Sequence, residues 1–157
     1  AGACYKGLGQ LKGSAKMFKM AVNLQSDYAE AHKNLGLVLK QLGHIDASIA
    51  SLQNAINSNK DYIDAHYSLA NIYKDNNQLD DAVRSYEKVI LISPGFAQAH
   101  NNLGNALNLL GRPEKALQSY SEAIDLDPSF VQAHNNLGNT FKDLNQRKIY
   151  NKKPISH

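Results

Sequence analysis

The sequence has very few of the residues that build covalent or metal-bound frameworks. It holds one cysteine, Cys4, and no tryptophan among its 157 residues. A single cysteine excludes an internal disulfide framework and any cluster of thiolate metal ligands. Four prolines in a chain that is 43% apolar do not indicate a disordered or fibrous protein. The chain is long enough for one domain with a buried core.

Long apolar runs and a strong excess of one charge are missing too. No run approaches the roughly 18 apolar residues of a membrane span. The net charge is +3, and the final segment from Arg147 onward holds four cations and no acid. The rest of the chain is close to neutral, so it lacks the basic face that a nucleic-acid partner needs. We therefore expect neither a membrane span nor nucleic-acid binding, and nothing in the sequence indicates a compartment.

A repeat of 34 residues is the strongest signal present. The segment Ala-His-Asn-Asn-Leu-Gly-Asn stands at 99–105 and again, unchanged, at 133–139. Related segments stand at 31–37 and 65–71. This spacing defines three complete units between two partial ones, at 1–28, 29–62, 63–96, 97–130 and 131–147.

Each unit has the pattern of two helices joined by a turn. Apolar residues recur at steps of three and four, as at Leu103, Ala106 and Leu107, which indicates a helix with one buried face. A glycine follows, where a helix often ends in a left-handed residue. This turn position is held by Gly9, Gly43, Asn77, Gly111 and Asn145. We expect helices near 29–42, 46–59, 63–76, 80–92, 97–110, 114–126 and 131–144.

Two positions of the repeat differ consistently in side-chain size, one being small and the other large. One position of the first helix holds only glycine or alanine, at Gly36, Ala70, Gly104 and Gly138. One position of the second helix is large, at Phe18, Leu52, Tyr86 and Tyr120. A residue without a side chain lets two helices approach closely, and a large residue fills the space between units. Because no unit can bury its own apolar face, the units must stack.

The period, the small residues and the closing prolines Pro94 and Pro128 resemble the tetratricopeptide repeat family over residues 1–147. The resemblance implies an all-α, right-handed superhelical solenoid in a single domain. Residues 148–157 would form a basic, disordered tail. The repeats also resemble the repeat array of O-linked N-acetylglucosamine transferases, which carry Asn-Leu-Gly or Asn-Leu-Ala in the first helix, as at Asn34, Asn102 and Asn136.

The sequence departs from the family where the early tryptophan is replaced by histidine, at His32, His66, His100 and His134. Neighbouring first helices should lie roughly 8–10 Å apart. Metal ligands must each come within about 2.1 Å of a zinc ion, and no second histidine lies one turn away. We interpret these residues as packing histidines with a hydrogen bond, and expect neither metal nor cofactor.

Asparagine crowds one face of the first helices, opposite the core stripe. The resemblance places this face on the concave side of the superhelix. Asparagine is a mediocre helix former, but its carboxamide offers both a donor and an acceptor. It can therefore pair with the N–H and C=O of an extended peptide without reading its side chains, as the resembled transferases are thought to do. The predicted peptide-binding groove comprises Asn34, Ser68, Asn71, Asn101, Asn102, Asn105, Asn108, Asn135, Asn136 and Asn139. The alternative is a neutral, solvated face.

Two other function classes are disfavoured. Acids such as Asp80 and Asp81 lie at predicted helix ends, where they are expected for local reasons. With no nucleophile–base pair and no phosphate loop, we expect no enzyme. The clamp of Lys, Arg and Asn with which some family members hold a C-terminal carboxylate lacks its cations here, because its matching places hold Tyr67, Asn71, Asn102, Gln132 and Asn136. We therefore expect a scaffold that binds a protein or an extended peptide.

The two ends give the runner-up hypothesis. The sequence begins at Ala1, inside a first helix, and ends after one helix of the last unit, with no polar cap at either end. Either this is part of a longer array, or another chain covers the ends. In the second case we expect a structural subunit that associates head to tail, because the two end surfaces differ. The expected contact residues are Leu8, Leu11, Leu137, Phe141 and Leu144.

Overall fold

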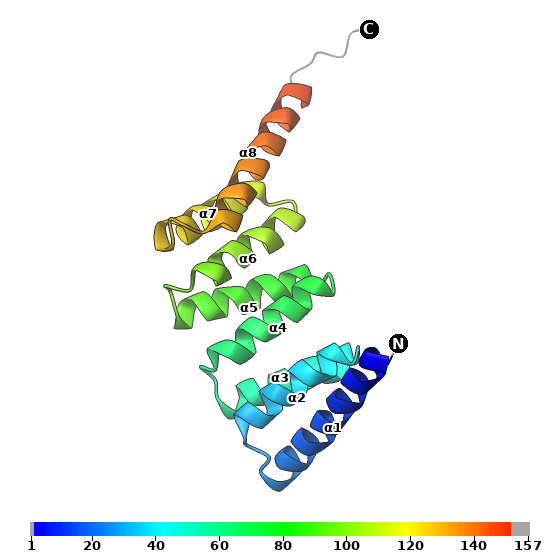
Figure 1. The fold of residues 1–157 in the computed structure, drawn as a ribbon. Coiled ribbons are helices and arrows are strands. Elements are labelled where there is room, and N and C mark those ends of the chain that lie inside the picture. Colours follow the sequence, from blue (N-terminus) through cyan, green and yellow to red (C-terminus); the bar gives the residue numbers. More distant parts are fainter. Residues whose placement is uncertain (1, 152–157) are drawn as a thin grey trace. The chain divides into compact units, whose positions relative to one another are not determined.

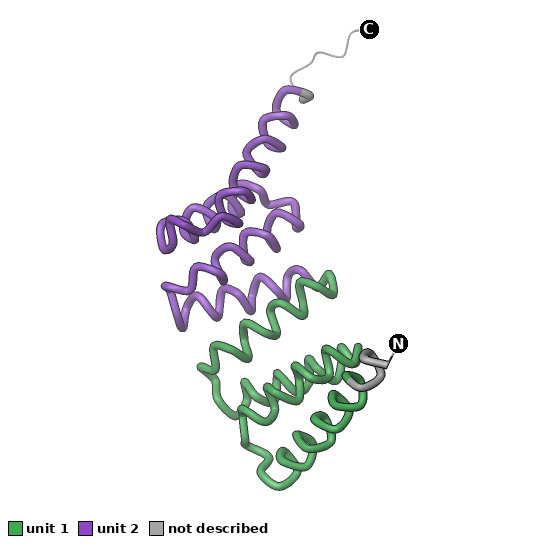
Figure 2. The backbone as a smooth tube through the Cα atoms, in the orientation of Figure 1, with its two compact units in different colours: residues 1–77 green, residues 78–157 purple. Residues whose placement is uncertain are grey.

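The computed structural model describes residues 2–151, which form helices joined by short turns, with no strand among them. The helices group into two compact units, residues 1–77 and 78–157, which Figure 2 distinguishes by colour. No helix in the described part of the chain combines the length and the apolar character needed to cross a bilayer.

The first unit contains α1 (Gly2–Leu24), α2 (Ala29–Gln41), α3 (Ile45–Ser58) and α4 (Ile63–Asp75) (Figure 1). Each helix packs against the next one along the chain, and α2 also contacts α4. Small and branched side chains are buried between the helices. One cluster consists of Ala15, Leu35 and Leu39, and the other of Leu52, Ala55, Ala65, Leu69 and Ile72.

The second unit contains α5 (Leu79–Ile92), α6 (Ala97–Leu109), α7 (Pro113–Leu126) and α8 (Val131–Asn151). Here too each helix packs against the next, and α6 also contacts α8. Tyr120 is the largest side chain buried between α6, α7 and α8, with 1% of its surface exposed. This unit contains the candidate site described below.

The helices confirm the predicted period. The first helices α2, α4, α6 and α8 begin at Ala29, Ile63, Ala97 and Val131, and the second helices α3, α5 and α7 begin at Ile45, Leu79 and Pro113. The predicted turn residues Gly43, Asn77 and Gly111 have φ angles of 80°, 58° and 72°. Glycine adopts this left-handed backbone without strain, and asparagine tolerates it. The all-α class of stacked helix–turn–helix repeats is therefore correct.

The small residues of the first helices have the predicted packing role. A Cβ atom on Gly104 would lie 2.5 Å from Cε1 of Tyr120, and one on Gly36 would lie 2.8 Å from Cγ of Leu52. The hydroxyl of Ser48 also donates a hydrogen bond of 2.6 Å to the carbonyl oxygen of Gly36. An added Cβ in either helix pair would therefore require Tyr120 or Leu52 to shift.

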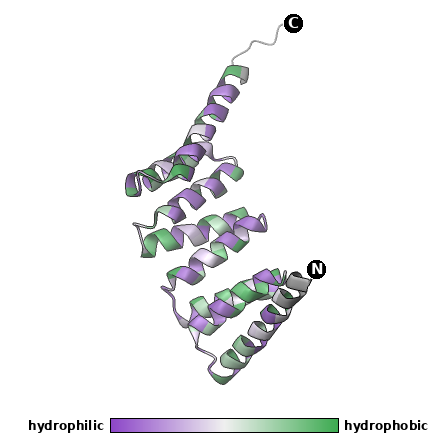
Figure 3. Ribbon diagram, viewed as in Figure 1, coloured by the Kyte–Doolittle hydropathy of each residue, from purple (hydrophilic) through white to green (hydrophobic). Residues whose placement is uncertain are grey.

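Two of the predicted turns are wrong. Gly9 lies inside the continuous helix α1, and Asn145 lies inside α8. A separate helix ending before Gly9 would have only about two turns, fewer than an isolated helix needs, so continuing α1 keeps more backbone hydrogen bonds. Beyond Leu144 the sequence lacks the apolar pattern with which a second helix would pack against α8. The outer part of α8 is mostly hydrophilic (Figure 3). Residues 148–151, predicted as disordered tail, are therefore helical, and residues 152–157 lie outside the described part.

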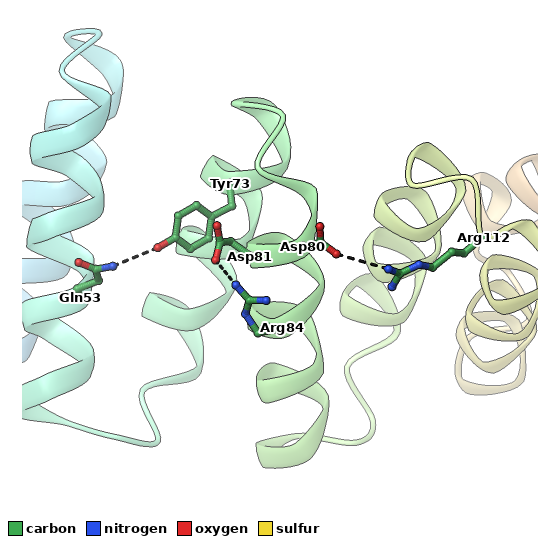
Figure 4. Close-up of polar contacts among 6 residues, drawn as sticks. All are labelled: Gln53, Tyr73, Asp80, Asp81, Arg84 and Arg112. Atoms are coloured by element: carbon green, nitrogen blue, oxygen red, sulfur yellow. Dashed lines mark hydrogen bonds and ion pairs between the residues drawn. The ribbon is translucent and has the colours of Figure 1, made fainter.

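Polar contacts also connect helices within each unit (Figure 4). In the first unit, Gln53 on α3 donates a hydrogen bond of 3.1 Å to the hydroxyl of Tyr73 on α4. In the second unit, Arg112 in the α6–α7 turn lies 3.6 Å from Asp80 at the start of α5. Arg112 and Asp80 are exposed, so their ion pair contributes at most about 1 kcal/mol to stability.

Candidate functional site

The four repeated histidines have a structural role in their turns. The Nε2 atom of each ring donates a hydrogen bond to the backbone carbonyl six residues earlier. The pairs are His32 with Ser26, His66 with Lys60, His100 with Pro94 and His134 with Pro128, at 2.9, 2.9, 3.0 and 2.9 Å. Because a carbonyl only accepts, Nε2 must carry the proton. The predicted hydrogen bond is confirmed for all four rings and connects each helix to the preceding turn, whereas only His32 and His66 are buried as packing residues.

The acids at the start of α5 and in the turn after α7 have partners nearby in the structure. Asp81 pairs with Arg84 one turn along α5, and Asp80 pairs with Arg112. Asp127 accepts hydrogen bonds from the backbone N–H and the hydroxyl of Ser129, at 3.0 and 2.7 Å. These contacts stabilise a helix start and a turn, as expected from their positions.

The second unit brings four of the predicted asparagines together in an amide cluster, defined as Asn101, Asn102 and Asn105 of α6 with Asn136 of α8. Nδ2 of Asn136 donates to Oδ1 of Asn101 and to Oδ1 of Asn105, each at 3.0 Å. A longer contact of 3.5 Å joins Asn101 to Asn102. Helical phase puts these residues on one face of α6, and the packing of α6 beside α8 closes the cluster.

Hydrogen-bond counting shows which groups of the cluster stay available. Nδ2 of Asn136 makes both of these hydrogen bonds, and its carbonyl oxygen, which accepts from no described residue, is left as an acceptor. The carbonyl oxygen of Asn105 accepts from Asn136 and from the hydroxyl of Tyr120, at 2.9 Å for the latter. Its NH₂ group donates to no described residue. The cluster therefore leaves one oriented acceptor and one oriented donor on neighbouring helices.

Asn105 and Asn136 both line a hollow of about 300 Å³, which we call the asparagine hollow. Its floor is formed by Tyr120 and Thr140, which are 1% and 2% exposed, and its rim by the exposed Asn108 and Asn139. Leu109, 66% exposed, adds an apolar side. The lining carries no charge. Its size is at the lower end for ligand pockets, so it suits a short stretch of chain.

Tyr120 and Thr140 belong to this site although sequence reasoning assigned Tyr120 to packing alone and did not single out Thr140. Burial raises the pKa of Tyr120, and a hydrogen bond with Thr140 lowers it by less. The phenol therefore stays protonated and donates to Asn105. A signal was present in the repeat: Thr140 takes the place of the apolar Val38, Ile72 and Ala106, and Tyr120 that of Leu52.

The other predicted groove residues have different environments. Asn101 is only 5% exposed, so it orients Asn136 and cannot offer its amide to a ligand as predicted. Asn135 is exposed. In the first unit, Asn34, Ser68 and Asn71 are each half-buried. A continuous row of amides along all the repeats stays a prediction.

Of the predicted end-contact residues, the most exposed are Phe141 on α8, at 51%, and Leu8 on α1, at 41%. Leu11, Leu137 and Leu144 are half-buried. Gly138 has open space around it, whereas the equivalent Gly104 is closed by Tyr120.

Three segments of the chain match the model of the TPR repeat family, at residues 36–76, 70–111 and 104–145. No curated protein matches the sequence. Among solved structures, YrrB, described as a TPR protein with an unusual peptide-binding site, is 27% identical with a TM-score of 0.73, over 86% of this chain and 70% of that one.

Two further structures share the fold. MamA from Desulfovibrio magneticus RS-1 is 21% identical with a TM-score of 0.81, over 94% of this chain and 82% of its own. The first TPR domain of Spaghetti (RPAP3), bound to the HSP90 peptide SRMEEVD, is 19% identical with a TM-score of 0.70, over 74% of this chain and 92% of its own.

Proposed function

This chain belongs to the tetratricopeptide repeat family, and from that premise we propose that it is a non-catalytic scaffold that holds an extended peptide by its backbone. The ligand lies in the asparagine hollow of the second unit and along the exposed asparagines beside it. YrrB and the RPAP3 domain, both of similar fold, are described with a peptide-binding site and with a bound peptide.

The observation that carries this proposal is the pair of hydrogen-bonding groups, one donor and one acceptor, that are not used within the amide cluster. Asn105 and Asn136, which carry this NH₂ group and this carbonyl oxygen, line the same hollow. A peptide unit presents the complementary pair, one C=O and one N–H. Because both carboxamides are already oriented by hydrogen bonds, they lose little freedom when the ligand binds.

The lining also favours an uncharged stretch of ligand. Neither a cation nor an anion borders the asparagine hollow, so a charged side chain seated there would lose hydration without a partner. The RPAP3 domain is bound to a peptide with two adjacent glutamates and a final aspartate. We propose a different ligand class here, namely a neutral segment away from a chain terminus.

The test uses a capped peptide of alternating threonine and valine, titrated onto the whole chain by calorimetry. Asn108→Ala combined with Asn139→Ala removes the exposed rim amides without touching the cluster. Each lost hydrogen bond should cost roughly 0.5–1.5 kcal/mol, so the double variant should bind several-fold more weakly. The same peptide with N-methylated amides should bind worse than one with its side chains in scrambled order.

Asn54→Ala, an exposed asparagine on α3, is the matched control and should leave the affinity unchanged. An unaltered affinity in the rim variant, with the helical circular dichroism intact, would refute backbone binding in the hollow. Asn102→Ala with Asn136→Ala tests the cluster itself. It should weaken binding further, because the spare carbonyl of Asn136 is removed.

End-to-end association is the second candidate, favoured by the open space around Gly138. In the pairs α2–α3 and α6–α7 the equivalent glycine is closed by Leu52 or Tyr120 of the second helix. Phe141 lies one turn further along α8 and is 51% exposed. Its counterpart on the other end surface is α1 of a second copy, where Ser14 is exposed although the equivalent Ser48 is fully buried.

Sedimentation of the pure chain across a range of concentrations tests this candidate. Association that is lost in Phe141→Asp would support it, and association unchanged by that substitution would place the contact elsewhere. Lys12 and Lys16 on α1 and Lys142 on α8 carry like charges, which repel at low salt. Head-to-tail association should therefore strengthen as salt is added.

A further inference from the structure

A second hollow, in the first unit, differs in chemistry from the asparagine hollow. It has a volume of about 380 Å³ and lies between α1 and the carboxyl end of α2. Its apolar floor includes Ala15 and Leu39, which are 7% and 5% exposed. Its edge carries Lys12, Lys16 and Lys19, all exposed. We call it the basic hollow.

The three lysines form one row along α1, because their spacing of four and three residues puts them on the same helix face. None of them forms an ion pair with a described residue. The residues of α1 include four lysines and no aspartate or glutamate. Like charges at this spacing destabilise a helix slightly, so local helix stability does not explain the row.

Comparison with the other repeats shows that the complete row of three lysines is particular to α1, although the position equivalent to Lys16 holds Arg84 in α5. The positions equivalent to Lys12 hold acids, namely Asp46, Asp80 and Glu114, and those equivalent to Lys19 hold Gln53, Glu87 and Ser121. The three acids lie in the first turn of their helices, where the helix dipole favours a negative charge. Lys12 lies inside α1, so an acid is not required there, but a neutral residue would serve equally well.

We propose that the basic hollow binds an acidic peptide segment with one apolar side chain at its centre. The apolar side chain enters between Leu39 and Met20, and carboxylates on either side pair with the lysines at the edge. At a rise of 1.5 Å per residue, the row from Lys12 to Lys19 is about 10 Å long. An extended peptide covers this length with about three residues, so one acid on each side of the apolar residue reaches the row.

A protein partner fits this site better than a membrane or a nucleic acid. A helix that lies on a membrane needs a broad exposed apolar face, whereas the floor residues Ala15 and Leu39 are buried and Met20 is the one exposed apolar residue of this lining. Nucleic-acid binding needs phosphate contacts from many cations, and only three lysines border the hollow. The site also differs from the cationic clamp of other family members, which lies among the first helices, whereas these lysines lie on a second helix.

The probe is the capped, fluorescently labelled peptide Glu-Asp-Leu-Asp-Glu, titrated onto the whole chain by fluorescence anisotropy. Lys16→Glu with Lys19→Glu should weaken its binding about tenfold or more, because two ion pairs become repulsive. Lys115→Glu with Lys142→Glu makes the same change in net charge elsewhere and should have a much smaller effect. Met20→Gln, at a position 49% exposed, tests the apolar contact without disturbing the core.

The proposal predicts that exchanging the central leucine of the probe for glycine weakens binding several-fold. Equal affinity for the two peptides would reduce the interaction to charge attraction and overturn the proposal. So would equal affinity of the wild type and the Lys16→Glu, Lys19→Glu variant. Capture by vesicles of equal parts phosphatidylcholine and phosphatidylserine, without peptide binding, would indicate a membrane surface instead. The Asn108→Ala, Asn139→Ala variant should bind the acidic peptide normally, which separates this site from the asparagine hollow.

Discussion

Two equivalent glycines with different surroundings provide a sharp test of the packing between α6 and α7. Gly104→Ala adds a Cβ that would lie 2.5, 2.7 and 3.0 Å from three ring atoms of Tyr120. Gly138→Ala adds the same atom at the same repeat position of α8, where nothing lies within 4 Å. The ring of Tyr120 is 1% exposed and its hydroxyl is bound to Asn105, so it has little room to move.

The magnitudes follow from two opposing effects. Alanine is favoured over glycine inside a helix by roughly 1 kcal/mol, and this gain applies to both variants. At Gly104 the overlap with the ring adds a cost of about 1–3 kcal/mol, typical of overpacking a core. Gly138→Ala should therefore stabilise the protein slightly, and Gly104→Ala should leave it unchanged or less stable. The difference between the two changes in the free energy of unfolding gives the cost of the overlap with the ring of Tyr120.

Urea denaturation followed by circular dichroism measures both free energies of unfolding. Gly36→Ala provides a repeat of the experiment in the first unit, where the added Cβ would meet Cγ of the buried Leu52 at 2.8 Å. Equal stabilisation by Gly104→Ala and Gly138→Ala would refute the close approach of α6 and α7. A loss of stability in Gly138→Ala would mean that another helix covers α8.

The remaining predictions concern the core, the left-handed turns and the buried phenol. Leu103→Ala should cost roughly 2–5 kcal/mol and the exposed Lys115→Ala less than about 0.5 kcal/mol; similar thermal melts for the two would show that the helical phase is wrong. Gly111→Ala should cost about 1–2 kcal/mol because φ is 72°, whereas Asn77→Gly should not lower the urea midpoint. Because burial raises the pKa of Tyr120 in the folded state, its stabilising contribution is complete below the unfolded value of about 10 and is lost as pH rises through the folded value. Tyr120→Phe should therefore be less sensitive to alkaline pH than the wild type in urea titrations, and an identical pH dependence would contradict a buried phenol.

Periodicity along the chain predicted most of what depends on a residue's place in its own helix or turn, except the turns at Gly9 and Asn145, which lie inside α1 and α8. The steps of three and four residues located the helices to within a few residues, as in α6 and α7. The left-handed turns at Gly43, Asn77 and Gly111 follow from the backbone preference of those residues together with the apolar pattern of the helices on both sides. The hydrogen bond of each repeated histidine also recurs with the period, because its acceptor lies six residues earlier in the same chain segment.

The burial and the hydrogen-bond partners of the site residues were decided by the packing of one helix on another. Asn101 and Asn105 have the same helical phase by sequence, but contact with α8 buries Asn101 and gives both carboxamides to Asn136 as acceptors. Tyr120 enters the same cluster because α7 brings its hydroxyl to Asn105. Lys12, Lys16 and Lys19 border a hollow because the packing of α2 against α1 places Leu39 beside them. Helical phase sets the direction of a side chain, whereas its burial and its partners depend on the neighbouring helix, which periodicity does not describe.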